Sequence, residues 1–120
     1  MTIYKSSMCG CCGLYSDYVN KESNLKVNIV SLDDVSSVKN KYNVPENLRS
    51  CHIAAIGDYY VEGHVPMEAV VKLMTEKPDI AGIALPGMPA GSPGMPGRKD
   101  GDFVIYAINH DGTHNEFMRI

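Results

Sequence analysis

The chain has 120 residues, which is long enough for one domain to bury a core without disulfide bonds or a structural metal. Its formal net charge of −3, with 21% charged residues, argues against nucleic acid or an anionic membrane surface as a partner. No apolar run approaches the ~18 residues of a membrane span.

The first part of the chain predicts two strand–helix pairs in succession. Residues 2–6 predict a short strand, and apolar side chains at helical spacing over 12–22 predict a helix. Residues 26–32 are rich in β-branched side chains, which favour a second, buried strand. The helix that follows, over 35–42, ends before Pro45 because the residue preceding a proline disfavours the helical conformation.

The next part predicts a hairpin and a third helix. A turn over 45–50 leads to strands at 53–56 and 59–62, joined by a two-residue turn. Residues 67–74, directly after Pro66, carry apolar side chains at helical spacing. The resulting β-α-β-α-β-β-α order predicts an α/β fold of the thioredoxin-like kind, in which helices flank a mixed sheet.

The remaining residues depart from this pattern. Residues 81–100 are rich in glycine and proline and contain Pro-Gly-Met-Pro twice, with Met88 and Met95 in the two copies. An irregular segment of this length inside a compact domain is usually functional or disordered. Residues 103–108 and 115–120 flank a turn and predict a β-hairpin. We therefore expect a single domain made of a thioredoxin-like core (1–80), a Pro-Gly-Met loop packed on or near the functional site (81–100) and a C-terminal hairpin (101–120).

Three of the four cysteines, Cys9, Cys11 and Cys12, lie within four residues, at the predicted junction of the first strand and first helix. Four cysteines in a chain of this length do not form a disulfide scaffold, so their clustering indicates a functional site. The unpaired N–H groups of a helix N-terminus stabilise a thiolate and lower the pKa of a cysteine below its ordinary ~8.5. Such a thiolate serves a redox nucleophile and a metal ligand equally well.

Cys51 and His52 precede the third predicted strand, whose entrance lies beside the first helix in thioredoxin-like folds. That entrance ordinarily holds a cis-proline, which keeps metals from an exposed dithiol. The nearest proline here is Pro45, so Cys51 takes the proline's place, which favours metal binding over redox exchange. Side chains alternate along a strand, so we expect one of the Cys51–His52 pair to miss the site and favour Cys51 as the ligand. His64, at the next strand–helix junction, is a further candidate.

The other histidines and the loop methionines are weaker candidates. Met88 and Met95 carry thioethers, which are soft ligands for Cu(I), but anchoring of the loop on apolar surface is the interpretation we favour. His110 and His114 lie in the predicted C-terminal turn and are expected to be solvated.

The adjacent Cys11 and Cys12 bear on which metal is bound. Neighbouring thiolates reach one tetrahedral ion only with strain, which disfavours zinc and an iron–sulfur cluster. They suit bridging, in which each sulfur binds two ions, and Cu(I) accepts thiolates together with His or Met. The residues therefore favour Cu(I), including a multinuclear thiolate cluster. A thiol–disulfide oxidoreductase using Cys9 and Cys12 is the alternative, and a zinc or iron–sulfur protein is a third interpretation.

Several motifs together resemble those of the small bacterial CopG-like copper-resistance proteins, long catalogued as a domain of unknown function. They occur in the family's order over residues 3–96, at 4–13, 44–45, 50–52, 61–66 and 86–95. The resemblance implies a thioredoxin-like domain that binds copper and is encoded beside copper-efflux systems, with copper-efflux or copper-chaperone proteins as candidate partners. It also implies export to the periplasm, although the chain shows no secretion signal and a cytoplasmic location is the other expectation. By matching position it implies a copper site containing Cys9, Cys11, Cys12 and Cys51, with family motifs also at His52, His64, Met88 and Met95.

Overall fold

The computed structural model describes residues 1–7, 10–23, 26–87, 89–95, 97–99 and 101–120, without the side chains of residues 10–12. Within these ranges the chain forms strands, helices and one 3₁₀ turn in the following order. They are β1 (Thr2–Ser6), α1 (Gly10–Glu22), β2 (Asn28–Leu32), α2 (Ser36–Lys41), η1 (Glu46–Leu48), β3 (His52–Ile56), β4 (Tyr59–Glu62), α3 (Met67–Glu76), β5 (Gly82–Ala84), β6 (Val104–Ile108) and β7 (His114–Arg119).

The described strands form one mixed sheet of seven strands in the order β2-β1-β3-β4-β5-β6-β7. β1 pairs in parallel with β2 and antiparallel with β3, and β3 pairs antiparallel with β4. The mixed α/β fold predicted from the sequence is confirmed, as is the order β-α-β-α-β-β-α of the first strands and α-helices. None of the described helices is long and apolar enough to cross a bilayer.

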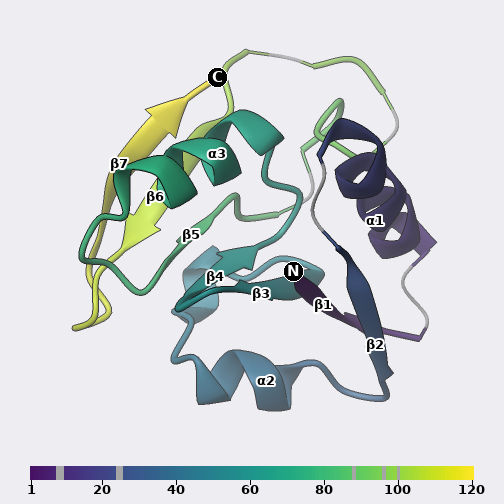
Figure 1. Cartoon of the computed structure of the whole chain (residues 1–120), viewed down its shortest axis with the longest axis horizontal. Coiled ribbons are helices and arrows are strands. Elements are labelled where there is room, and N and C mark those ends of the chain that lie inside the picture. Colours follow the sequence, from purple (N-terminus) through teal and green to yellow (C-terminus); the bar gives the residue numbers. More distant parts are fainter. Residues whose placement is uncertain (8–9, 24–25, 88, 96, 100) are drawn as a thin grey trace.

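The helices cover both faces of the sheet (Figure 1). On one face, Tyr15 and Val19 of α1 and Leu73 of α3 belong to the larger apolar core, together with inward-facing residues of the sheet such as Ile3. On the opposite face a smaller core contains buried sheet residues, with α2 packed against it through its partly buried apolar side chains. The first turn of α1 therefore lies on the α3 side of the sheet, at the end of β1.

The prediction that the second strand is buried is wrong. β2 lies at the edge of the sheet, and four of its five residues are exposed. Its β-branched composition suits a strand at any position in a sheet, because it reflects the fit of these side chains to a pleated surface rather than the number of neighbouring strands.

The expectation of a loop throughout residues 81–100 is also incomplete, because β5 lies inside this segment. β5 pairs in parallel with β4 and antiparallel with β6, so it connects the C-terminal hairpin to the rest of the sheet. A Cβ atom at Gly82 would come within 2.4 Å of the carbonyl oxygen of Tyr60, so only glycine fits there. The strand is three residues long and begins with this glycine, which removes the usual sequence signal of a strand. The predicted hairpin itself is confirmed as β6 and β7.

Candidate metal centre

Cys51, His52 and His64 come together at one point beside the sheet. One potential ligand atom from each residue lies within 4.8 Å of those of the other two. The Sγ atom of Cys51 is 3.0 Å from Nε2 of His64 and 3.2 Å from Nδ1 of His52. Both imidazoles are fully buried, and Cys51 is partly buried. A thiol and two imidazoles at this spacing form a group that could hold a metal ion.

The structure brings both Cys51 and His52 to this point. The alternation of side chains along a strand predicted instead that one of the two would point away from the site. The physical reason is the start of β3, which begins at His52 and leaves Cys51 in a bend outside the strand. Alternation applies only between residues that are both extended, so it places no restriction on this pair.

Gly63 places His64 at the same point. Its N–H donates to the carbonyl oxygen of His52 at 3.1 Å, and its φ of 88° is in the left-handed region. A Cβ atom here would lie 2.6 Å from the carbonyl oxygen of Leu85 and 2.8 Å from Cβ of Ser50. Because the backbone at Gly63 passes this close to Leu85 and Ser50, the position between β4 and His64 requires glycine.

The tautomer of His64 follows from its second contact. Its Nδ1 lies 2.6 Å from the carbonyl oxygen of Pro93, and a carbonyl can only accept a hydrogen bond. Nδ1 therefore carries the proton, and Nε2 presents a lone pair toward Cys51. Metal-binding histidines commonly have this arrangement, in which a backbone carbonyl fixes the ring orientation.

His52 and His64 are both held neutral. Burial, the neighbouring His64 and Lys39 lower the pKa of His52 to about 3. Burial also lowers the pKa of His64 below its ordinary value. Within the described part of the chain, Nε2 of His52 is buried and has no hydrogen-bond partner. Neutral imidazoles are the form that binds metals, so both rings are ready to act as ligands near neutral pH.

Tyr15 connects α1 to this centre. Its hydroxyl donates to the carbonyl oxygen of Val65 at 2.7 Å, and its ring centroid is 4.7 Å from that of His52 and 5.5 Å from that of His64. Cys11 and Cys12 occupy the first turn of α1, four and three residues before Tyr15. Cys9 and the side chains of Cys11 and Cys12 lie outside the described parts of the structure.

A buried ion pair supports Cys51 from the other face of the sheet, and the sequence analysis missed it. Nζ of Lys39 is 2.9 Å from Oε2 of Glu62, and both side chains are buried. The same carboxylate oxygen accepts a hydrogen bond from the N–H of Ser50 at 3.0 Å, and Nζ donates to the carbonyl oxygen of Ser50 at 2.5 Å. Burial raises the pKa of Glu62, an effect that Lys39 opposes. The residue before Cys51 is thus held through both of its backbone groups.

The other sequence candidates are two methionines and two histidines. Met95 lines a groove along α1 with Leu14 and Tyr18, while Met88 is outside the described residues. His110 is exposed and contacts Asp79 at 3.0 Å. His114 is also exposed, but it begins β7 rather than lying in the turn.

Two solved structures, both of proteins named copper resistance protein CopG, are similar to almost the whole chain. The structure called Form 2 has a TM-score of 0.91 and 33% sequence identity, and the match covers 99% of this chain and 95% of that one. Form 1 has a TM-score of 0.90 and 33% identity, with 99% and 94% covered. The chain belongs to the CopG family.

A family model described as "Protein of unknown function, DUF411" also matches, over residues 48–95. The matched CopG-family segment contains Cys51, His52 and His64, together with the loop residue Pro93 that contacts His64. A search of curated proteins finds no significant match. The candidate metal centre therefore lies within the part of the chain that the family model covers.

Proposed function

We propose that this CopG-family chain binds Cu(I) as its cargo, in copper resistance or homeostasis, at a site centred on Cys51, His52 and His64. The observation that carries the proposal is the position of the Cys51 sulfur within 3.2 Å of two buried, neutral imidazoles. Thiolate and imidazole are ligands that copper prefers to carboxylate and water. The names of the two similar structures support copper as the metal.

In this proposal Cys9, Cys11 and Cys12 extend the ligand set from the start of α1. The contact of Tyr15 with both imidazoles supports this, because Cys11 and Cys12 precede Tyr15 by about one helical turn. The unpaired N–H groups at the start of a helix stabilise thiolates, and each cysteine releases its proton to solvent as it binds copper. Adjacent thiolates suit bridging, so we propose a multinuclear Cu(I)–thiolate cluster.

The loop over residues 81–100 covers the site in this proposal, and residues 1–80 and 101–120 supply the rest of the domain. Two contacts support this role. Ser50 donates its hydroxyl hydrogen to the carbonyl oxygen of Gly87, and His64 donates to that of Pro93. We propose that Met95 anchors the loop on α1, whereas Met88 remains a candidate thioether ligand.

The proposal is tested by titrating reduced, metal-free protein with Cu(I) under anaerobic conditions against a chromogenic Cu(I) chelator. The wild-type chain is expected to take copper from the chelator, and Cys51→Ser is expected to take markedly less. His110→Ala is the matched control, because His110 is an exposed histidine outside the cluster and its partner among the described residues is Asp79 on the surface. Far-UV circular dichroism confirms that each variant is folded.

Three results would contradict the proposal. They are failure of the wild-type chain to compete for copper, equal uptake by Cys51→Ser and the control, and a preference for Zn(II) in the same titration. Elemental analysis of protein purified under reducing conditions gives an independent measure of which metal is carried.

The alternative function is thiol–disulfide exchange through Cys9 and Cys12. The bend residue Cys51, placed between two neutral imidazoles, supports metal binding over this alternative, because a dithiol enzyme needs neither imidazole. An insulin-reduction assay separates the two functions, since a copper carrier is expected to be inactive in it. From the family we further propose a periplasmic location and an exchange of copper with efflux or chaperone proteins, which cell fractionation and copper-transfer assays test.

A further inference from the structure

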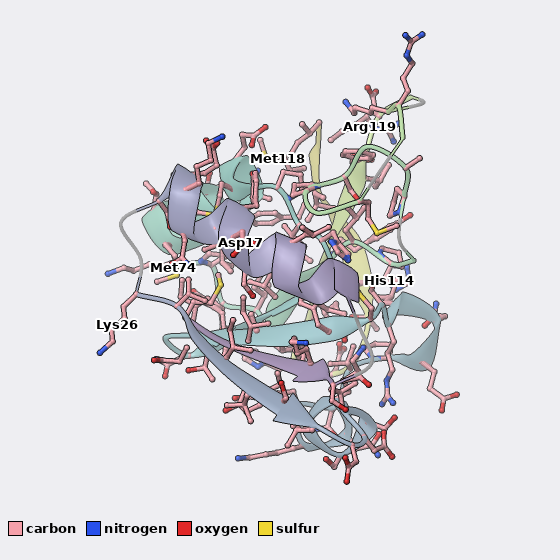
Figure 2. All side chains as sticks on the ribbon, turned by 90° about the vertical axis from the view of Figure 1, so that its right-hand side faces the viewer. Asp17, Lys26, Met74, His114, Met118 and Arg119 are labelled. Carbon is pink, nitrogen blue, oxygen red and sulfur yellow. The ribbon has the colours of Figure 1, made fainter. Side chains whose placement is uncertain are left out.

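The buried ion pair between Lys39 and Glu62 lies on the α2 side of the sheet, opposite the imidazoles. Glu62 pairs across β3 and β4 with Ile53, which belongs to the smaller core on that side. The ring of His52 packs instead against Tyr15 of α1, on the other face. Figure 2 shows α2 and α1, the helix labelled at Asp17, on opposite sides of the strands. The ion pair therefore approaches the metal centre from the face that the ligands leave unused.

The two charged side chains bind the backbone of one residue, Ser50. Oε2 of Glu62 accepts a hydrogen bond from the N–H of Ser50 at 3.0 Å, and Nζ of Lys39 donates to its carbonyl oxygen at 2.5 Å. The hydroxyl of Ser50 donates to the carbonyl oxygen of Gly87. Ser50 is thus fixed by α2, by β4 and by the loop.

The position of Cys51 depends on its neighbours in the chain. Cys51 lies in a bend, and the pairing of β3 with β1 begins one residue later, at His52. Ser50 on one side and the first residue of the strand on the other set the direction in which the Cys51 side chain points. That direction determines the distances of 3.0 Å and 3.2 Å from its sulfur to His64 and His52.

The ion pair is a costly way to stabilise a fold. Two charges lose their hydration on burial, and replacing a buried ion pair by apolar residues of similar volume is often neutral or stabilising. Within the described part of the chain, Oε1 of Glu62 is buried and has no hydrogen-bond partner, which adds to the cost. An apolar pair would, however, lose both contacts with the backbone of Ser50. This difference indicates a role in placing Cys51 rather than in stability alone.

We propose that Lys39 and Glu62 are positioning residues for the copper site, which fix the backbone of Ser50 and thereby hold the sulfur of Cys51 beside the two imidazoles. The inference rests on the proposed function, because it assigns the ion pair to the same site. It predicts that stability and copper affinity respond differently when the pair is replaced.

Replacing both residues at once separates the two effects. Lys39→Met combined with Glu62→Met removes both charges together, so the metal-free variant is expected to melt close to the wild-type temperature. Its affinity for Cu(I), measured anaerobically against a chromogenic chelator, is expected to fall about 10–100-fold, as is usual when the residues that orient metal ligands are lost. The matched control is Glu116→Met combined with Arg119→Met, which removes an exposed ion pair of β7 and is expected to change neither quantity.

A conservative variant reverses the order of the two effects. Glu62→Gln keeps an oxygen that accepts from the N–H of Ser50, but it leaves the buried ammonium of Lys39 without a counter-charge. It is therefore expected to be less stable than the double methionine variant and to bind Cu(I) more tightly. A side chain that acted on copper binding through stability alone would not give this reversed order.

Amide hydrogen exchange of the metal-free protein, followed by NMR, measures the hold on Ser50 without copper. Its N–H is expected to be protected in the wild-type chain and in Glu62→Gln, and to exchange faster in the double methionine variant. Three results would each overturn the positioning role: unchanged exchange at Ser50, wild-type copper affinity in the double variant, and affinities that follow stability in every variant. A wild-type chain that binds no Cu(I) would instead contradict the proposed function itself, and this inference with it.

Discussion

Lys39 and Glu62 form a buried ion pair, with 2.9 Å between Nζ and Oε2, directly beneath the backbone of the residue that precedes Cys51. Charges are costly to bury, and this pair offsets part of the cost by binding both backbone groups of Ser50. Since Ser50 also donates to the loop through its hydroxyl, the pair connects α2, β4 and the loop to the entrance of β3.

The ion pair should be sensitive to the loss of one partner. Lys39→Met leaves a buried carboxylate without its counter-charge, and we expect it to lower the free energy of unfolding of the metal-free protein by about 3–5 kcal/mol. Urea denaturation measures this change. The control is Arg119→Met, which removes the cation of an exposed ion pair and should change stability little. Equal effects of the two substitutions would show that the buried pair does not support the fold.

A second prediction concerns the glycine before His64. Gly63→Ala both forces a left-handed backbone onto a residue with a Cβ atom and creates a 2.6 Å contact with the carbonyl oxygen of Leu85. Gly112→Ala is the matched control, because Gly112 has a φ of 89° and, among the described residues other than its chain neighbours, no heavy atom lies within 4 Å of an added Cβ. The control should cost about 1–2 kcal/mol of stability, and Gly63→Ala should cost more and also weaken copper uptake. Indistinguishable melting curves and uptake for the two variants would contradict this explanation.

The buried histidines predict a pH dependence of the metal-free protein. The pKa of His52 is about 3 in the folded state against an ordinary 6.5, so between these values the unfolded chain binds a proton that the folded chain does not. The contribution of His52 to stability is therefore complete above pH 6.5 and decreases as the pH falls toward 3, with a slope set by the uptake of one proton on unfolding.

Chemical denaturation in the presence of a metal chelator, between pH 4 and 8, measures this slope. His52→Asn should have a shallower slope than wild type, whereas His110→Gln, which changes an exposed histidine, should retain the wild-type slope. Parallel curves for His52→Asn and wild type would mean that His52 does not remain neutral in the folded protein.

The sequence was sufficient for the order β-α-β-α-β-β-α of the first strands and α-helices, but not for the position of β2 in the sheet or for the presence of β5. Local patterns predict that residues 28–32 form a strand, but only the pairing partners decide that this strand is an edge. β5 was not predicted, because a strand of three residues that begins with Gly82 is too short to show an alternation of apolar and polar side chains. Both features depend on contacts between distant segments, which a local pattern does not contain.

The candidate site shows the same division. Cys51 and His64 were identified as candidates because each lies next to the end of a predicted strand, where a cysteine or histidine can be recognised in the sequence. His52 was discounted by a strand rule that does not apply to a pair divided by the start of β3. Lys39 and Glu62 were missed, although each carries a signal in retrospect, namely a charged residue on the otherwise apolar face of a helix or strand.

The central claim is that copper binds to the sulfur of Cys51 and to the imidazoles of His52 and His64. X-ray absorption at the copper K-edge, on protein loaded anaerobically with Cu(I), tests it most directly. The wild-type spectrum is expected to show sulfur ligands together with the outer-shell scattering of imidazole, and the imidazole signal should be lost when His52 and His64 are both replaced by Asn. A spectrum with sulfur ligands alone, or an imidazole signal that survives this double replacement, would contradict the claim.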